Sequence, residues 1–227
     1  MPSDEHDGAG HRERLRERLF AGGGDAFHDH ELLEYMLALA IPRRDTKPLA
    51  KALLREFGSF ARVISAEAAA LQNFGGLSAT AIGALKFTQA AALRLQREAV
   101  MDRPVLSNWQ ALLSYCHASM AHSLIEQFRV LFLNNKNILI RDEVMAEGTV
   151  NHAPVYVREV LKRALDLGST AIILVHNHPS GDPSPSKDDI AITQEIIEAG
   201  KRLGVRVHDH LVIGSTGHAS FKTLGLI

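Results

Sequence analysis

The sequence predicts a small all-α domain at residues 1–101 followed by an α/β domain with a mixed sheet at residues 105–227. Up to about residue 100, apolar residues recur with helical spacing. After residue 126, short runs of branched apolar residues alternate with helical segments. Mixed strands and helices of this kind predict an α/β domain with its site at strand ends. Asp102-Arg103-Pro104 is the expected linker, because a proline disfavours helix in the residue before it.

The composition excludes several classes of protein. Of 227 residues, 46% are hydrophobic and 22% are charged, which is typical of a soluble globular protein with a sizeable core. A net charge of −1 gives no overall basic field of the kind that attracts nucleic acid. No apolar run is long enough to span a membrane, and the charged start lacks a signal-peptide core. Because Cys116 is the one cysteine, no intramolecular disulfide can form, and a cytoplasmic location is expected.

The helical domain is expected to begin after about ten disordered residues. Its first helix carries the run of alternating charges from Arg12 to Arg18, which we interpret as a solvated face. Glycines and prolines then mark the ends of the following helices. The expected helices are Glu31–Ala40 before Pro42, Pro48–Phe57 before Gly58, and about Ala81 to Ala99 at the end of the domain.

The segment Glu67–Leu85 predicts a helix, a two-glycine turn at Gly75-Gly76, and a second helix. This is the outline of a helix-hairpin-helix element, which binds phosphate through free N–H groups at a helix N-terminus. Ser78 stands where the usual pattern has a second glycine. A tight corner between two helices of a small bundle is therefore the favoured interpretation.

The α/β domain is predicted from strand and helix signals that alternate along the chain. Ser107 is expected to cap a helix that runs through Tyr115. The later helices end at glycines, and turn-forming residues separate the strands. The expected strands are Phe128–Leu133, Ile138–Val144, Ile172–Val175, Val205–Ile213 and Ala219–Lys222, and the expected helices are Val157–Leu167 and Asp188–Leu203.

A candidate metal site lies at the end of the apolar strand Ile172–Val175. His176 and His178 follow it one residue apart, so their side chains point to the same face and can share one cation. A loop rich in glycine and proline could return Asp189 as a third, oxygen ligand. Two histidines, one aspartate and an open position are the ligand set of a catalytic zinc site. An alternative is structural, because Ser186 and Asp189 also have the spacing of a helix-capping pair.

The spacing H-x-H-P-x(6)-S-x-x-D resembles the signature of the JAMM (MPN+) zinc metallohydrolases, and HNHPSGDPSPSKDD is very similar to the bacterial RadC branch. The resemblance covers most of residues 105–227. It includes Glu126–Phe132, Gly148-Thr149, Val157–Val160 and Asp209-His210. It implies a JAMM/MPN-like, cytidine-deaminase-like fold that binds one Zn²⁺ per chain through His176, His178 and Asp189. Asp182 and Asp188 are nearby carboxylates, but only position 189 fits the family spacing.

The resemblance also implies roles for two further residues. Glu126, at the head of a predicted strand, matches the family's glutamate, which acts as general base and acid on the attacking water. Ser186 would donate a hydrogen bond to the developing oxyanion. Other glutamates remain candidates for the base, namely Glu143, Glu147 and Glu159. A second H-x-H, His208 and His210, is interpreted as supporting or structural, because no carboxylate follows it at a useful spacing.

Two functions are consistent with these features. The first is a zinc-dependent peptidase or isopeptidase that uses zinc-activated water and acts on a peptide or isopeptide substrate. The second is a DNA-associated repair protein, with the second domain as nuclease or scaffold and weak DNA binding by the helical domain. The balanced charge of residues 1–100 favours the first. The local basic cluster would supply few phosphate contacts and consists of Arg43, Arg44, Lys47 and Lys51.

Overall fold

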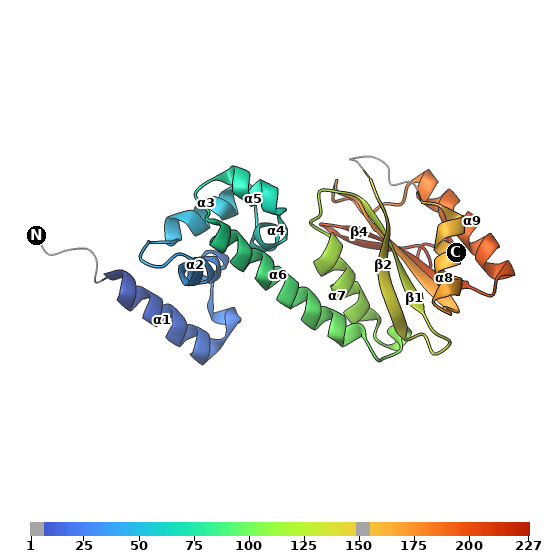
Figure 1. Ribbon diagram of the computed structural model, residues 1–227, viewed down its shortest axis with the longest axis horizontal. Helices are drawn as coiled ribbons and strands as arrows, with labels where there is room; N and C mark the ends of the chain where they lie inside the picture. Colours follow the sequence, from blue (N-terminus) through green and yellow to red (C-terminus); the bar gives the residue numbers. More distant parts are fainter. Residues whose placement is uncertain (1–6, 149–154) are drawn as a thin grey trace, which may run out of the picture. The chain divides into compact units, whose positions relative to one another are not determined.

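The computed structural model describes residues 7–148 and 155–227 (Figure 1). The chain divides into two compact units, with the boundary between Ala92 and Leu93. This boundary lies within helix α6 (Ala79–Val100), before the predicted linker at Asp102-Arg103-Pro104. Among the described residues, no helix combines the length and the apolar character that crossing a membrane requires.

The helical unit consists of short helices around one apolar core. α1 begins at Asp7, so it includes the end of the segment that was expected to be disordered, and residues 1–6 lie outside the described residues. Fully buried leucines from four different helices meet in the core, namely Leu33, Leu53, Leu71 and Leu85. The elements before α6 are α1 (Asp7–Gly22), the 3-10 helix η1 (Gly24–Ala26), α2 (Asp29–Ala40), α3 (Lys47–Phe57), α4 (Phe60–Ser65) and α5 (Ala68–Phe74).

The predicted turn between two helices is present between α5 and α6. Gly75 and Gly76 have φ angles of 80° and 74°, a conformation that glycine adopts without steric cost. The Ser78 hydroxyl accepts a hydrogen bond from the backbone N–H of Ala81 at 3.2 Å, so the serine caps α6. A side chain therefore already satisfies an N–H group that a phosphate would use. DNA binding by this unit stays a prediction.

The second unit is built on a five-stranded mixed sheet with the order β2-β1-β3-β4-β5. β1 (Gln127–Leu133) lies antiparallel to both β2 (Leu139–Glu147) and β3 (Ala171–Asn177). β3 and β4 (Arg206–Gly214) are parallel, and β5 (Gly217–Ser220) pairs antiparallel with β4. β2 extends beyond the predicted Val144, and Thr149 lies outside the described residues. The mixed sheet confirms the predicted α/β class.

Helices cover both faces of this sheet (Figure 1). α7 (Trp109–Met120) packs on one face, against alternate residues such as Leu131 and Ile173. α8 (Val157–Asp166) and α9 (Lys187–Arg202) pack on the other face, against the intervening residues such as Val130 and Leu174. Because both faces are covered, every residue of the central strand β3 is buried.

The predicted cap of α7 and the predicted position of the last strand are wrong. Ser107 does not cap α7, because it lies in the 3-10 helix η2 (Val105–Ser107) and its hydroxyl donates to the carbonyl of Pro104 at 2.8 Å. α7 begins at Trp109 instead. The last strand was predicted at Ala219–Lys222 but spans Gly217–Ser220, because a two-residue turn after Gly214 brings Gly217 opposite it.

The cysteine lies in the interior of the second unit. Cys116 of α7 is 2% exposed and belongs to the core between α7 and the sheet. Burial raises the pKa of its thiol to about 12, so the side chain is protonated at neutral pH.

We predict that an ion pair between α1 and α2 makes stability depend on pH. Arg18 donates two hydrogen bonds to Glu31, at 2.8 and 3.0 Å, and these, together with a hydrogen bond from the backbone N–H of His28 at 3.1 Å, lower the pKa of Glu31 to about 2. The ordinary pKa of glutamate is about 4.3, so the stabilisation is complete above that pH and is lost as the pH falls toward 2. We expect Glu31→Gln to lower the melting temperature at pH 7, with a difference from the parent that shrinks between about pH 5 and pH 2.

Thermal unfolding followed by circular dichroism at several pH values measures this difference. Glu13→Gln is the matched control, because Glu13 pairs with Arg16 across an exposed helix surface at 2.9 Å and is expected to contribute little. A difference that does not change with pH would contradict the assignment to Glu31.

Candidate metal centre

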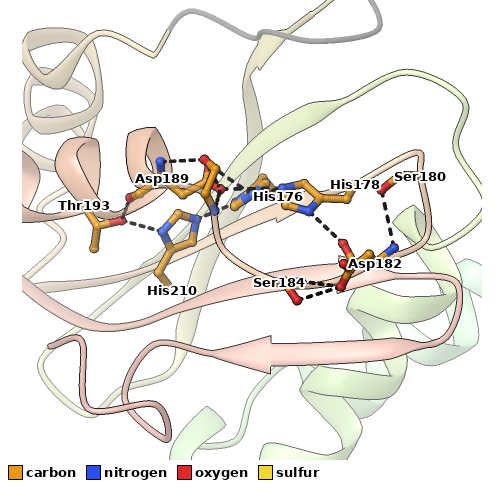
Figure 2. Close-up of polar contacts among 9 residues, drawn as sticks. His176, His178, Ser180, Asp182, Ser184, Asp189, Thr193 and His210 are labelled. Atoms are coloured by element: carbon orange, nitrogen blue, oxygen red, sulfur yellow. Dashed lines mark hydrogen bonds and ion pairs between the residues drawn. The ribbon is translucent and has the colours of Figure 1, made fainter.

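The candidate site forms where the carboxyl end of β3 meets the N-terminus of α9 (Figure 2). His176 lies in β3 and His178 immediately follows the strand, on the same face of the sheet. Asp189 lies in the first turn of α9, where the positive end of the helix dipole favours a carboxylate. The loop between His178 and Ser186 joins the two elements. The structure therefore brings together the three residues that the sequence identified as metal ligands.

The three side chains present their donor atoms to one point. His176 Nε2 lies 3.0 Å from His178 Nε2 and 3.3 Å from Asp189 Oδ1, and His178 Nε2 lies 3.6 Å from Asp189 Oδ2. One ligand atom from each residue lies within 4.8 Å of the others. Two imidazole nitrogens and a carboxylate oxygen are donors that zinc accepts. Among the residues that the structure describes, this is the group of acids, histidines or cysteines that could hold a metal ion.

The second nitrogen of each histidine is held by the protein. His178 Nδ1 lies 2.8 Å from the carbonyl oxygen of Asp182, and because a carbonyl only accepts, Nδ1 carries the proton. Nε2 of His178 is then the nitrogen that can bind a metal. His176 Nδ1 lies 2.7 Å from Nε2 of His210, which is fully buried on β4.

Asp189 has one oxygen held by the protein and one that faces His176. The backbone N–H and the hydroxyl of Ser186 both donate to Asp189 Oδ2 at 2.7 Å, and the Asp189 N–H donates back to the serine oxygen at 3.1 Å. This is a capping box at the start of α9. Burial raises the pKa of Asp189, but the hydrogen bonds to His176, His178 and Ser186 outweigh it and hold the pKa well below its usual value. The contact between His178 and the Asp189 carboxylate in turn raises the pKa of His178.

Ser186 is thus the N-cap of α9 in this structure. Its one hydroxyl proton is directed at the carboxylate of Asp189, as the alternative interpretation from the sequence expected. To donate to an oxyanion, the Ser186 hydroxyl would have to turn away from Asp189. That catalytic role stays a prediction.

Glu126 lies beside the candidate ligands. It directly precedes β1, and the antiparallel register that pairs Phe128 with His176 places Glu126 opposite His178 when it is continued by two residues. The negative charge of Glu126 contributes to the raised pKa of His178, after larger effects from Asp189 and the carbonyl of Asp182. A half-buried carboxylate at this position could exchange protons with a water next to the histidines.

The backbone on both sides of Glu126 is bound by Asn177, a residue that the sequence analysis did not identify. The Asn177 side chain accepts from the N–H of Gln127 at 2.9 Å and donates to the carbonyl of Ile125 at 3.1 Å. Asn177 is 1% exposed and lies between the two histidines in the sequence. Its side chain alternates with those of the histidines, and its partners are brought to it only by the pairing of β1 with β3.

The other candidate carboxylates have different partners. The Asp182 carboxylate accepts from Ser184, and Asp188 is exposed to solvent. Each remaining glutamate that was considered as a base is also engaged. Glu143 forms a two-point ion pair with Arg163, Glu147 accepts from Gln127, and Glu159 pairs with the adjacent Arg158.

The second H-x-H does not form a second metal pair. An irregularity in the pairing of β3 with β4 adds one residue to β4 near His208. His208 Nε2 then lies 2.7 Å from the Asn137 side chain, whereas His210 contacts His176 and Thr193. Burial lowers the pKa of His210 well below its ordinary value, so this imidazole is neutral. The interpretation of these histidines as supporting residues agrees with this geometry.

Two glycines allow the loop after His178 to pack against the β4–β5 turn. A methyl group on Gly214 would lie 2.2 Å from the backbone carbonyl oxygen of Gly181, which is closer than a side-chain carbon can approach an oxygen. The Thr216 hydroxyl donates to that same oxygen at 2.9 Å. The backbone N–H of His178 donates to the carbonyl of Ile213 at 2.9 Å. The position of the loop, and with it the carbonyl of Asp182, thus depends on close backbone contact.

Comparison with known proteins places this site in a family. The sequence model of the RadC-like JAB domain matches residues 106–226. A UPF0758 protein of Rhodobacter capsulatus is 56% identical over 213 residues, which is 94% of this chain and 100% of the relative. A UPF0758 protein of Ruegeria pomeroyi is 52% identical over 227 residues, covering 100% of both chains.

We predict that Gly214→Ala destabilises the second unit. The added methyl group cannot avoid the Gly181 carbonyl without moving the loop, and overpacking of this kind commonly costs about 1–3 kcal/mol. Urea unfolding of the full chain, followed by fluorescence of the single tryptophan, Trp109, measures the change.

Gly83→Ala is the matched control, because a methyl group there meets no atom within 4 Å and position 83 lies inside helix α6. Because Gly83 belongs to the helical unit and Trp109 to the second unit, this control should leave the transition that Trp109 reports unchanged. Equal stability of Gly214→Ala and the parent would show that the loop does not depend on this contact.

Proposed function

Because the chain belongs to the RadC-like JAB domain family and carries a His-His-Asp group that could hold a metal ion, we propose that it is a zinc-dependent hydrolase of peptide or isopeptide bonds. The observation that carries this proposal is the arrangement of His176, His178 and Asp189. Each turns one donor atom toward the others, while a protein group holds its second polar atom.

The donor set supports zinc as the ion. Catalytic zinc sites commonly use three protein ligands drawn from histidine and carboxylate, whereas structural sites close with four ligands, usually including cysteine. Here the one cysteine, Cys116, lies in the core on the opposite face of the sheet. Zinc supplies a Lewis acid that lowers the pKa of water from about 15.7 toward about 7.

Glu126 supports the hydrolytic part of the proposal. Its negative charge acts on His178, and the amide of Asn177 fixes the backbone on both sides of it. In the proposed reaction Glu126 accepts a proton from the attacking water and later gives a proton to the leaving amine. Ser186 would stabilise the oxyanion by turning its hydroxyl away from Asp189 and donating that hydrogen bond to the substrate oxygen.

The first test is the zinc content of the full chain purified without added metal. We expect about one zinc per chain in the parent and almost none in His178→Ala or Asp189→Ala, because each loses one of three donors. Zinc content is measured by plasma mass spectrometry, and circular dichroism checks that the variants are folded. A parent that binds no zinc after reconstitution would refute the proposal.

The second test separates catalysis from metal binding. Glu126→Gln should keep its zinc but lose activity by about 10²–10⁴-fold on a panel of fluorogenic peptides and isopeptides, because the amide cannot accept the proton. Glu159→Gln is the matched control, since Glu159 pairs with Arg158 on an exposed helix surface. Equal activity of Glu126→Gln and the parent would assign the general base to another group.

A further inference from the structure

A buried chain of hydrogen bonds leads from the metal ligand His176 through His210 and Thr193 to the backbone of Asp189 (Figure 2). We propose that His210 and Thr193 are positioning residues that hold His176 in the one tautomer able to bind a metal through Nε2. The positioning role rests on the proposed function, because it concerns metal binding. The donor and acceptor of each hydrogen bond follow from the contacts within the protein and do not depend on a metal.

The direction of the chain is fixed at Thr193. Its hydroxyl oxygen lies 2.5 Å from the carbonyl oxygen of Asp189, one turn earlier in α9. A carbonyl oxygen can only accept, so the hydroxyl gives its single proton to Asp189. The same hydroxyl oxygen lies 2.6 Å from Nδ1 of His210 and must accept there. His210 therefore carries a proton on Nδ1.

The direction at Thr193 determines the state of both imidazoles. His210 is fully buried between two aromatic rings and neither of its ring nitrogens is bonded to a carboxylate, so it is neutral, and with its one proton on Nδ1 its Nε2 is an acceptor. This nitrogen lies 2.7 Å from Nδ1 of His176, which must then donate its proton to it. With its proton on Nδ1, neutral His176 has a lone pair on Nε2, and Nε2 is the atom directed at His178 and Asp189.

Solvent water does not reach the hydrogen-bonded side chains of His176, His210 and Thr193. His176, Thr193 and His210 are 1%, 0% and 0% exposed. Two aromatic rings cover His210, with the Phe221 ring centroid at 4.5 Å and the Phe128 centroid at 5.5 Å. Because both nitrogens of His210 and the hydroxyl of Thr193 have protein partners, no polar atom of these two side chains is left to bind water or metal.

The same face of α9 supplies both ends of this arrangement. Asp189 gives the side-chain oxygen that faces the metal position, and its carbonyl receives the proton of Thr193 four residues later. The protein thus uses a neutral imidazole as the partner of a ligating histidine, where a carboxylate, a backbone carbonyl or water is the usual choice. A neutral partner adds no negative charge to the site.

The first experiment reads the tautomers directly, in metal-free protein and without any substrate. Long-range ¹H–¹⁵N correlation spectra of the full chain distinguish protonated from bare ring nitrogens. We expect a protonated Nδ1 and a bare Nε2 in His210, and a protonated Nδ1 in His176. A His210 that carries its proton on Nε2 would overturn the proposed direction of the chain.

The second experiment measures zinc affinity by competition with a chromogenic chelator. Thr193→Val keeps the shape of the side chain and removes the hydroxyl, whereas Thr193→Ser keeps the hydroxyl. We expect Thr193→Val to bind zinc about 10–100-fold more weakly than the parent, the range for loss of a supporting partner, and Thr193→Ser to bind it within about threefold of the parent.

Thr88→Val is the matched control for the loss of a helical threonine. The Thr88 hydroxyl also donates to a carbonyl one turn earlier, that of Ala84 at 2.9 Å, but it belongs to the helical unit. Its zinc affinity should equal that of the parent. His210→Leu interrupts the same series of hydrogen bonds at a second residue. The aromatic rings around position 210 can accept an apolar side chain.

The outcomes separate this inference from the proposed function. Thr193→Val with the affinity of the parent would overturn the positioning role, and so would Thr193→Ser as weak as Thr193→Val, since the methyl group rather than the hydroxyl would then matter. A parent that binds no zinc would refute the proposed function, and with it the role of His210 and Thr193 in metal binding. The tautomers in the metal-free protein would still confirm or overturn the hydrogen-bond direction.

Discussion

The arrangement of elements around the end of β3 in the second unit depends on hydrogen-bond partners for two histidines, because this strand is buried on both faces. His176 is 1% exposed, so each of its nitrogens needs a partner inside the protein. Neighbouring elements supply these partners: β4 contributes His210, α9 contributes Thr193 and Asp189, and the loop contributes the carbonyl that holds His178. The irregular pairing of β4 and the close contact of Gly181 with Gly214 both serve to bring these groups within reach.

At the N-terminus of α9, one residue both caps the helix and faces the candidate metal position. Asp189 completes the capping box through Oδ2 and leaves Oδ1 directed at His176. The capping interpretation is therefore correct, and it is compatible with the metal-ligand interpretation, which stays a prediction, because a carboxylate has two oxygens. The helix start and the candidate ligand position are fixed by the same hydrogen bonds, so a change that frays the helix also displaces the ligand.

The sequence predicted the fold class and the clustering of three candidate ligands because each depends on short-range pattern. A buried strand, an H-x-H at its end and a helix start at Ser186 can all be recognised within a segment of fewer than twenty residues. The roles of His210 and Thr193 depend on the register between β3 and β4 and on the packing of α9, which no local pattern encodes. The role of Asn177 was not predicted for the same reason, since its partners Ile125 and Gln127 lie about fifty residues earlier in the sequence and are brought to it by the pairing of β1 with β3. Ser107 misled because a serine before a helix can also bond within a preceding 3-10 turn.

The buried thiol of Cys116 has a practical consequence for studies of this molecule in solution. Only a thiolate reacts at an appreciable rate, and this thiol is both protonated at neutral pH and enclosed by the core of the second unit. An alkylating reagent can therefore modify this thiol only when that core opens. The labelling rate reports the frequency of such openings, and the helical unit contributes nothing to the signal because it has no cysteine.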